Sequence, residues 1–277
     1  MKFASYLKDG QPTFGVVVGD GLVTLGNKLP HVPTLRAAIE AGALAQLGEA
    51  AVDAQPDIAL AEAVFLPVIP NPSKTLCVGA NYRDHAAEAG KTEKPWPGYF
   101  IRVDDTIVGH GQPLEAPVVS EAFDFEGELA LVIGRPARHI AESEALAYVA
   151  GYTCFMDGSV RDYQKRCISA GKNFQASGAS GPFLVTADEI PDPAQLTLTT
   201  YLNGDQVQHS SIAMMIHSVP KTIAYLSTII QLRPGDVIAT GTPAGVGHGR
   251  EPPLWMRRGD RITVEISGVG RLSNPVA

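Results

Sequence analysis

Short apolar segments separated by glycine, proline and aspartate make up most of the chain from residue 74 onward. One of them, Arg261–Ile266, alternates apolar and polar side chains, which is typical of a strand with one buried face. The pair Asn203-Gly204 predicts a hairpin turn. We expect strands at 129–133, 151–156, 196–202 and 261–266. Helical patterns are limited to 143–149 and 219–230, so the balance predicts a strand-rich α+β fold.

The first 66 residues have a different pattern. Residues 14–23 predict two short strands around a Gly-Asp-Gly turn, and residues 35–47 predict a helix that Thr34 caps. Prolines then stand at positions 67, 70 and 72, and each lacks a backbone donor and restricts the residue before it. We expect a small N-terminal α/β domain at 1–66, a proline-rich linker at 67–73 and a larger domain at 74–277.

Composition excludes several classes of protein. The chain has 277 residues and a formal net charge of −7, from 22 Lys+Arg and 29 Asp+Glu, which disfavours nucleic-acid binding. No stretch approaches the roughly 18 apolar residues of a membrane helix. Cys77, Cys154 and Cys167 form no paired motif, which argues against disulfides and zinc sites. We expect a cytoplasmic protein without nucleic-acid or membrane partners.

Three carboxylates form the first candidate site. If residues 123–129 are one strand, Glu126 and Glu128 lie on the same face, where their charges repel unless a cation lies between them. Asp157 follows the predicted strand 151–156 directly. Three carboxylates without soft ligands suit Mg²⁺ or Mn²⁺, and Arg161 and Lys172 could attract an anionic substrate. The alternative is a solvated sheet edge with charges that deter aggregation.

A histidine and a glutamate form the second candidate site. The alanine-rich segment after Asn81 predicts a short helix, capped by Asn81 or Asp84. His85 and Glu88 are three residues apart and share one helix face, so Glu88 could orient the imidazole as a general base. The alternative is an ordinary surface pair.

Other catalytic motifs are absent from the sequence. There is no Gly-x-Ser-x-Gly elbow of a serine hydrolase and no His-Glu-x-x-His zinc motif. The glycine-rich segment 240–247 lacks the Gly-Lys-Ser/Thr of a P-loop.

An ordered set of segments resembles the fumarylacetoacetate hydrolase family. The set includes Phe-Glu-Gly-Glu at 125–128 and Gly-Lys-Asn-Phe at 171–174. The matching segments are 77–88, 125–134, 151–153, 157, 161–164, 171–174, 181–182, 203–204, 234–247 and 272–276. The resemblance implies a mixed β-sandwich roll, a homodimer, and a small N-terminal domain like that of bacterial members.

The resemblance also implies roles for individual residues. It makes Glu126, Glu128 and Asp157 the ligands of one Mg²⁺ or Mn²⁺ ion per chain. It makes His85 and Glu88 a dyad that activates water, on a segment that closes over the substrate. The other catalytic positions are Lys172 and Gln164, and the substrate contacts are Arg161, Thr242 and Tyr82.

The implied reaction is hydrolysis of a C–C bond in a 3-acylpyruvate or related 1,3-diketo acid, through an enolate that the metal stabilises. Decarboxylation of a 2-oxo acid such as oxaloacetate and isomerisation of a 2-hydroxymuconate-type acid are the alternatives. A further alternative is a non-catalytic metal-dependent binding protein with the same fold. The presence of the His85–Glu88 dyad argues against it, because a binding protein has no need of a general base.

Two positions depart from the family pattern. Arg102 stands where the family often has lysine, and Gln175 where it frequently has aspartate. Because arginine and lysine are not interchangeable, we expect these positions to affect substrate identity and not the metal site. Residues 91–98, with Trp96, are expected to form part of a lid.

Overall fold

The computed structural model describes residues 1–88, 90 and 92–277. The strands are β1 (Lys2–Lys8), β2 (Gln11–Val18), β3 (Gly21–Thr24), β4 (Ile58–Ala59), β5 (Val64–Phe65), β6 (Thr75–Gly79), β7 (Gly98–Arg102), β8 (Ile107–Val108), β9 (Phe123–Asp124), β10 (Gly127–Ile133), β11 (Val149–Met156), β12 (Ser159–Val160), β13 (Gly178–Thr186), β14 (Thr197–Leu202), β15 (Asp205–Ser211), β16 (Val237–Ala239), β17 (Arg261–Ile266) and β18 (Gly270–Pro275). The α-helices are α1 (Leu35–Glu40), α2 (Leu44–Glu49), α3 (Arg83–Glu88), α4 (Arg161–Gln164), α5 (Ile168–Lys172) and α6 (Val219–Ile229). Short 3-10 helices occupy Leu60–Glu62, Asp104–Thr106, Glu142–Tyr148, Ala187–Glu189, Pro193–Gln195, Ile212–Met214 and Gly247–Gly249.

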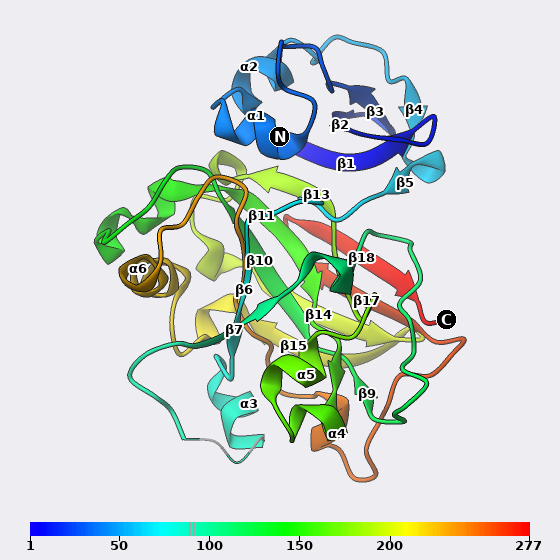
Figure 1. The fold of residues 1–277 in the computed structure, drawn as a ribbon, viewed down its shortest axis with the longest axis vertical. Helices are drawn as coiled ribbons and strands as arrows, with labels where there is room; N and C mark the ends of the chain where they lie inside the picture. The colour runs from blue at the N-terminus through cyan, green and yellow to red at the C-terminus, as the bar shows by residue number, and fades with distance from the viewer. Residues whose placement is uncertain (89, 91) are drawn as a thin grey trace.

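Two sheets carry the fold (Figure 1). The larger has 12 strands, ten of them in the order β4-β3-β2-β1-β13-β11-β10-β16-β6-β7, with β5 beside β1 and β8 beside β13. The smaller has four strands in the order β15-β14-β17-β18. The pairs β13–β8 and β16–β6 are parallel, and the paired strands around them are antiparallel, so the large sheet is mixed. The predicted strand-rich α+β sandwich is confirmed.

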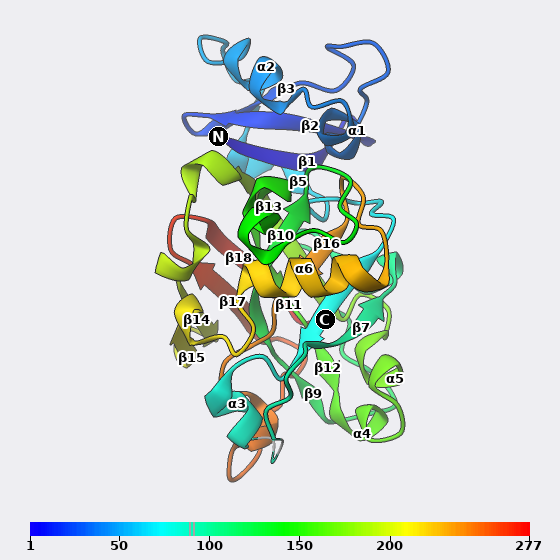
Figure 2. The same ribbon diagram turned by 90° about the vertical axis from the view of Figure 1, so that its left-hand side faces the viewer.

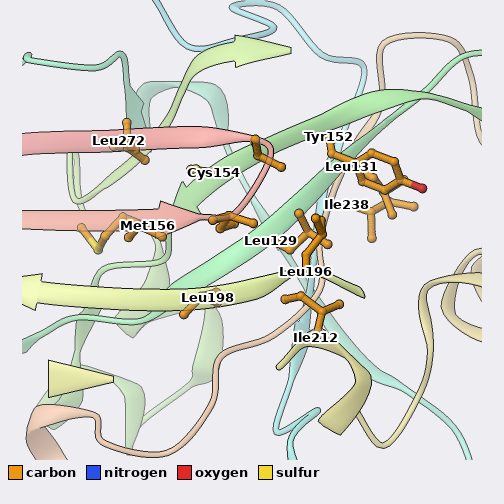
Figure 3. Packing of buried hydrophobic residues seen from close by; sticks show 14 of the residues in the cluster. Leu129, Leu131, Tyr152, Cys154, Met156, Leu196, Leu198, Ile212, Ile238 and Leu272 are labelled. Atoms are coloured by element: carbon orange, nitrogen blue, oxygen red, sulfur yellow. The ribbon is translucent and has the colours of Figure 1, made fainter. Parts of the chain in front are cut away.

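Strand β10 lies in the middle of the core because both of its faces are buried. Leu129 and Leu131 point into the cluster between the two sheets, with Leu198 of β14 and Leu272 of β18 (Figure 3). Ala130, between them in the sequence, belongs to the cluster on the opposite face. A strand buried on both faces needs a continuous apolar sequence, which is what residues 129–133 provide.

The N-terminal unit extends the large sheet. Strand β1 pairs with β13, with Lys2 opposite Val185. The segment after the unit is also tied to the sheet, because Ser5 Oγ donates to Val68 O at 2.9 Å and Val68 N donates to Ser180 Oγ at 3.2 Å. The division of the chain at residues 67–73 stays a prediction.

Two predicted helices differ from the structure. The helix expected at 35–47 is divided into α1 and α2, because Gly42 takes a φ of 64° and the N–H of Ala43 bonds to Ala38 O, which closes a Schellman motif. Thr34 caps α1 as expected, accepting from Ala37 N at 3.1 Å. The segment expected as a helix at 143–149 is the 3-10 helix Glu142–Tyr148, and β11 begins directly after it.

The third helix prediction and the hairpins are confirmed. Helix α6 begins after Ser218, whose side chain accepts from Lys221 N, and it packs across the large sheet (Figure 2). Asn203 and Gly204 both have positive φ between β14 and β15, as a two-residue hairpin turn requires. Among the described residues, no helix is long and apolar enough to cross a membrane.

The N-terminal unit and helices α3 and α4 lie at opposite ends of the molecule in both views (Figures 1 and 2). The candidate site residues gather near α3, α4 and α5, away from the N-terminal unit.

Candidate active site and metal centre

Antiparallel pairing of β10 and β11 brings the carboxylates of Glu126 and Asp157 together. Gly127 is opposite Met156, so the residues just outside the ladder, Glu126 and Asp157, are neighbours, and Asp157 N donates to Glu126 O at 2.8 Å. The expected continuous strand 123–129 is wrong, because the chain leaves the ladder at Phe125 and Glu126 between β9 and β10. Glu128 is on β10 itself, opposite Phe155.

The three carboxylates form one buried cluster. One oxygen from each of Glu126, Glu128 and Asp157 lies within 4.8 Å of the other two, and all three residues are buried. The predicted alternative of a solvated sheet edge is therefore wrong. Buried oxygen ligands without sulfur or imidazole are the donor set that Mg²⁺ and Mn²⁺ prefer.

Two of the carboxylates have cationic partners. Lys172 Nζ lies 2.6 Å from Glu126 Oε2 and 2.7 Å from Asp157 Oδ2. Burial alone would lower the pKa of Lys172, but the charges of Asp157 and Glu126 outweigh it and raise the pKa. Arg161 Nη2 lies 2.8 Å from Glu126 Oε1. Burial raises the pKa of Glu126, but Lys172 and Arg161 outweigh it and hold the pKa below the usual glutamate range.

Glu128 is the exception, because it has no salt-bridge partner among the described residues. Its Oε2 accepts from the backbone N–H of Gly241 at 2.8 Å. Burial raises the pKa of Glu128, and the charges of Asp157 and Glu126 raise it further. A divalent cation among the three carboxylates would offset this repulsion. The cluster therefore fits the metal in both donor chemistry and charge.

Asp124 is a site residue that the sequence analysis did not single out. Its carboxylate is fully buried and accepts from Gly247 N at 2.7 Å, His248 N at 3.0 Å and Arg161 Nε at 2.7 Å. Asp124 thus joins the glycine-rich loop 240–250 to Arg161. Arg161 Nη1 in turn donates to Gln164 Oε1 at 2.9 Å, so α4 presents both side chains together.

The histidine and glutamate of α3 form the expected pair. His85 Nδ1 lies 3.1 Å from Glu88 Oε2, and Glu88 Oε1 accepts from Gly245 N at 3.1 Å. Burial raises the pKa of Glu88, but the hydrogen bonds from His85 and Gly245 outweigh it and lower the pKa. Because Glu88 also bonds to a distant loop, the pair is not an ordinary surface pair.

The expected helix cap of α3 is wrong. Asn81 uses its amide for tertiary contacts: Nδ2 donates to His217 O and Thr240 O, and Oδ1 accepts from His217 N. Asp84 lies inside the helix and not before it. Asn81 therefore anchors the segment that leads into α3 to the loop after β16.

Most of the predicted site residues line one cavity of about 550 Å³. It is lined by His85, Glu88, Glu126, Arg161, Gln164, Lys172 and Thr242, among others. The Thr242 hydroxyl is already engaged, since it donates to Gly127 O and accepts from Gln208 Nε2. Tyr82 does not line this cavity. It is fully buried, and its hydroxyl has no hydrogen-bond partner among the described residues.

The two residues that depart from the family pattern differ in burial and in their contact with the site. Gln175 is exposed. Arg102 is buried, and its guanidinium donates to the Asp157 carboxylate. Arg102 therefore contacts a carboxylate of the cluster directly, and the expectation that this position affects substrate identity and not the metal site stays a prediction. Of the expected lid, Lys91 lies outside the described residues, and Trp96 lines a second cavity of about 480 Å³ that shares Phe100 and Ile168 with the first.

Known proteins of similar sequence were found over most of the chain. The family model described as fumarylacetoacetate (FAA) hydrolase C-terminal matches residues 74–277. The mitochondrial oxaloacetate tautomerase fahd2 of Xenopus laevis is 37% identical over 274 residues, covering 96% of this chain and 86% of the relative. The oxaloacetate tautomerase YisK of Bacillus subtilis is 41% identical over 223 residues, covering 78% and 74%.

Solved structures of other proteins have a similar fold over the whole length of this chain. Fumarylacetoacetate hydrolase from psychrophilic Exiguobacterium antarcticum has a TM-score of 0.82 at 33% identity, covering 100% of this chain and 99% of that one. Maleylpyruvate hydrolase from Sphingobium sp. SYK-6, in complex with manganese(II) and pyruvate, has a TM-score of 0.83 at 29% identity, covering 100% and 99%. With its matching residues, fold and buried carboxylate cluster, the chain belongs to the fumarylacetoacetate hydrolase family of metal-dependent enzymes.

Proposed function

We propose that the protein interconverts the keto and enol forms of oxaloacetate or a closely related 2-oxo dicarboxylic acid. The observation that carries the proposal is that His85, backed by Glu88, lines the same cavity as Glu126 and Lys172. A proton acceptor thus lies beside the carboxylate cluster and a fixed cation. Relatives that are 37–41% identical carry the name oxaloacetate tautomerase, which supports this reaction.

Glu126, Glu128 and Asp157 would hold the divalent metal. When bound there, Mg²⁺ or Mn²⁺ would supply a Lewis acid toward the carboxylate and keto oxygens of the substrate. Two cationic side chains of the protein would also attract the substrate. Arg161 and Lys172 line the cavity and attract a dianionic substrate to a protein of net negative charge.

The dyad moves the proton. If Nδ1 of His85 donates to Glu88, Nε2 carries the free lone pair and can accept a proton from C3 of the substrate. The C–H electron pair then forms the C2–C3 double bond, and the carbonyl oxygen gains a negative charge. The Lys172 ammonium, buried in the cavity wall, offsets that charge. Return of that proton from the His85 imidazolium to the oxygen completes the enol and regenerates the base, and the reverse sequence restores the keto form.

Hydrolysis of a C–C bond in a 3-acylpyruvate is the second candidate. The likeness to maleylpyruvate hydrolase, with a TM-score of 0.83, favours it. The same His85 nitrogen would then take a proton from water, which attacks the distal carbonyl. Both candidates use an enolate of the 2-oxo acid and differ in whether a bond between carbons breaks.

One assay separates these reactions. The Mn²⁺-loaded protein is mixed with oxaloacetate, and the enol is followed by its ultraviolet absorbance while pyruvate is measured with lactate dehydrogenase. Faster keto–enol exchange without pyruvate supports the proposal. Pyruvate from oxaloacetate would instead indicate a decarboxylase, and pyruvate from acetylpyruvate or fumarylpyruvate a hydrolase. The matched controls are EDTA treatment and Glu128→Gln, both of which should abolish the activity.

A further inference from the structure

Arg102 is the largest of the fully buried side chains, with an exposed fraction of 1%. All five of its N–H groups have acceptors. Nη1 donates to Asp157 Oδ1 at 2.5 Å and to Gly158 O at 3.0 Å. Nη2 donates to Ser177 Oγ at 2.6 Å and to Thr106 O at 3.2 Å, and Nε donates to Thr106 Oγ1 at 3.2 Å. The guanidinium is therefore fixed in the plane that these acceptors define.

Only one of these acceptors carries a charge, and it belongs to the carboxylate cluster. Asp157 Oδ1 is held by Arg102, and Oδ2 is held by Lys172 at 2.7 Å. The two contacts come from different elements, β7 and α5, so they fix the rotation of the carboxylate from two sides. We propose that Arg102 is a positioning residue that orients Asp157 for metal binding. This inference rests on the assignment of Glu126, Glu128 and Asp157 as metal ligands.

A lysine at position 102 would not reproduce this arrangement. Its ammonium has three donors on one nitrogen, whereas the acceptors around Arg102 require five donors from a planar fork. A lysine that reached Asp157 would leave Ser177 Oγ or the Thr106 oxygens without their donor. A lysine that bonded to those groups would release Asp157.

Gly178 of β13 supplies the space for the guanidinium. A Cβ atom at this position would lie 2.9 Å from Cζ and Nη2 of Arg102 and 2.9 Å from Cδ1 of Ile107. Such contacts are too short for real Cβ atoms, so an alanine there would displace the arginine head group. Gly178→Ala therefore perturbs the same contact without changing any charge.

The expected effect is on metal affinity. Loss of a partner that orients a metal ligand typically weakens binding about 10- to 100-fold. In Arg102→Lys the Asp157 carboxylate keeps Lys172, but its second anchor is either lost or reduced to a flexible ammonium without the planar fork, so part of its orientation must be established when the metal binds. Maximal turnover at saturating metal should fall less than metal affinity.

Mn²⁺ titration followed by electron paramagnetic resonance tests the inference, because free and bound Mn²⁺ have different spectra. The full-length protein is stripped of metal and compared with Arg102→Lys and Gly178→Ala, with thermal unfolding as a check on folding. Both variants should bind Mn²⁺ about 10- to 100-fold more weakly. The matched control is Arg36→Lys, which changes a surface pair with Glu40 and should leave the Mn²⁺ affinity unchanged.

The outcomes are distinguishable. If Arg102→Lys folds and binds Mn²⁺ within twofold of the wild type, the inference is overturned and Arg102 has a structural role alone. If Arg102→Lys fails to fold, an unchanged affinity in Gly178→Ala would overturn the inference in the same way. A wild-type protein that binds no Mn²⁺ would overturn the metal assignment, and the inference with it.

Discussion

Removal of the His85 imidazole isolates proton transfer from metal binding. His85 has an exposed fraction of 6%, and its ring lines the cavity and bonds to Glu88 at 3.1 Å. Among the described residues it has no hydrogen bond to the three carboxylates of the cluster. His85→Ala should therefore remove the base and leave the Mn²⁺ site intact.

The magnitude follows from this role. A positioned general base typically contributes about 10²- to 10⁴-fold to the rate, which corresponds to about 2.7–5.4 kcal/mol of barrier at about 1.36 kcal/mol per tenfold change. His85→Ala should lose turnover of oxaloacetate by that factor. Its affinity for Mn²⁺ should stay within about twofold of the wild type, because no ligand of the cluster is altered.

The assay measures kcat at saturating Mn²⁺ together with the dissociation constant of Mn²⁺. The control is His209→Ala, which removes an exposed histidine whose Nδ1 pairs with Thr199 Oγ1 and which lies outside the cavity lining. It should retain both values. The reasoning is refuted if His85→Ala keeps turnover within fivefold of the wild type, or if its Mn²⁺ affinity falls as much as its activity.

Three further predictions follow from the same geometry. Glu128→Gln should abolish Mn²⁺ binding. It should also raise the Tm of the metal-free protein by a few degrees in EDTA, because it removes a buried carboxylate that has no cationic partner among the described residues. About 1 kcal/mol shifts Tm by about 2–4 °C in a chain of this size. Leu131→Ala should lower the free energy of unfolding by about 3–5 kcal/mol in urea titrations, because the side chain is fully buried; an unchanged midpoint would contradict this packing. The pKa of Glu88 is lowered in the folded protein, so its stabilisation is present above the ordinary value of 4.5 and is lost as the pH falls through the lower folded value. The stability difference between the wild type and Glu88→Gln should therefore shrink as the pH falls below 4.5, and a constant difference would count against that shift.

Local signals predicted local structure well. The apolar run 129–133 and the Asn203-Gly204 pair correspond to β10 and the β14–β15 turn, because strand burial and turn conformation depend on residues close in the sequence. Thr34 was recognisable as a cap for the same reason. The break of the 35–47 helix was also encoded locally, by Gly42 with its φ of 64°, but the alanine- and leucine-rich sequence around it hid the signal.

The pairing of site residues was only partly predictable. The three-residue spacing of His85 and Glu88 gives their contact directly, since they share a helix face. The bond from Gly245 to Glu88 joins residues 157 positions apart and depends on where the loop after β16 lies. No local sequence pattern predicts a contact between residues that far apart in the chain.

By itself, the sequence determined the strand-rich fold, the resemblance to a family and the identity of the three carboxylates. Only the tertiary structure decided how those carboxylates are held. Asp124 and Arg102 are single polar residues whose contacts no local pattern predicted, since both are buried beside partners distant in the sequence. A buried charge must find a partner because leaving water is costly. Which partner it finds is set by the tertiary arrangement, here by the pairing of β10 with β11 and of β11 with β13, and by Arg102 at the end of the edge strand β7.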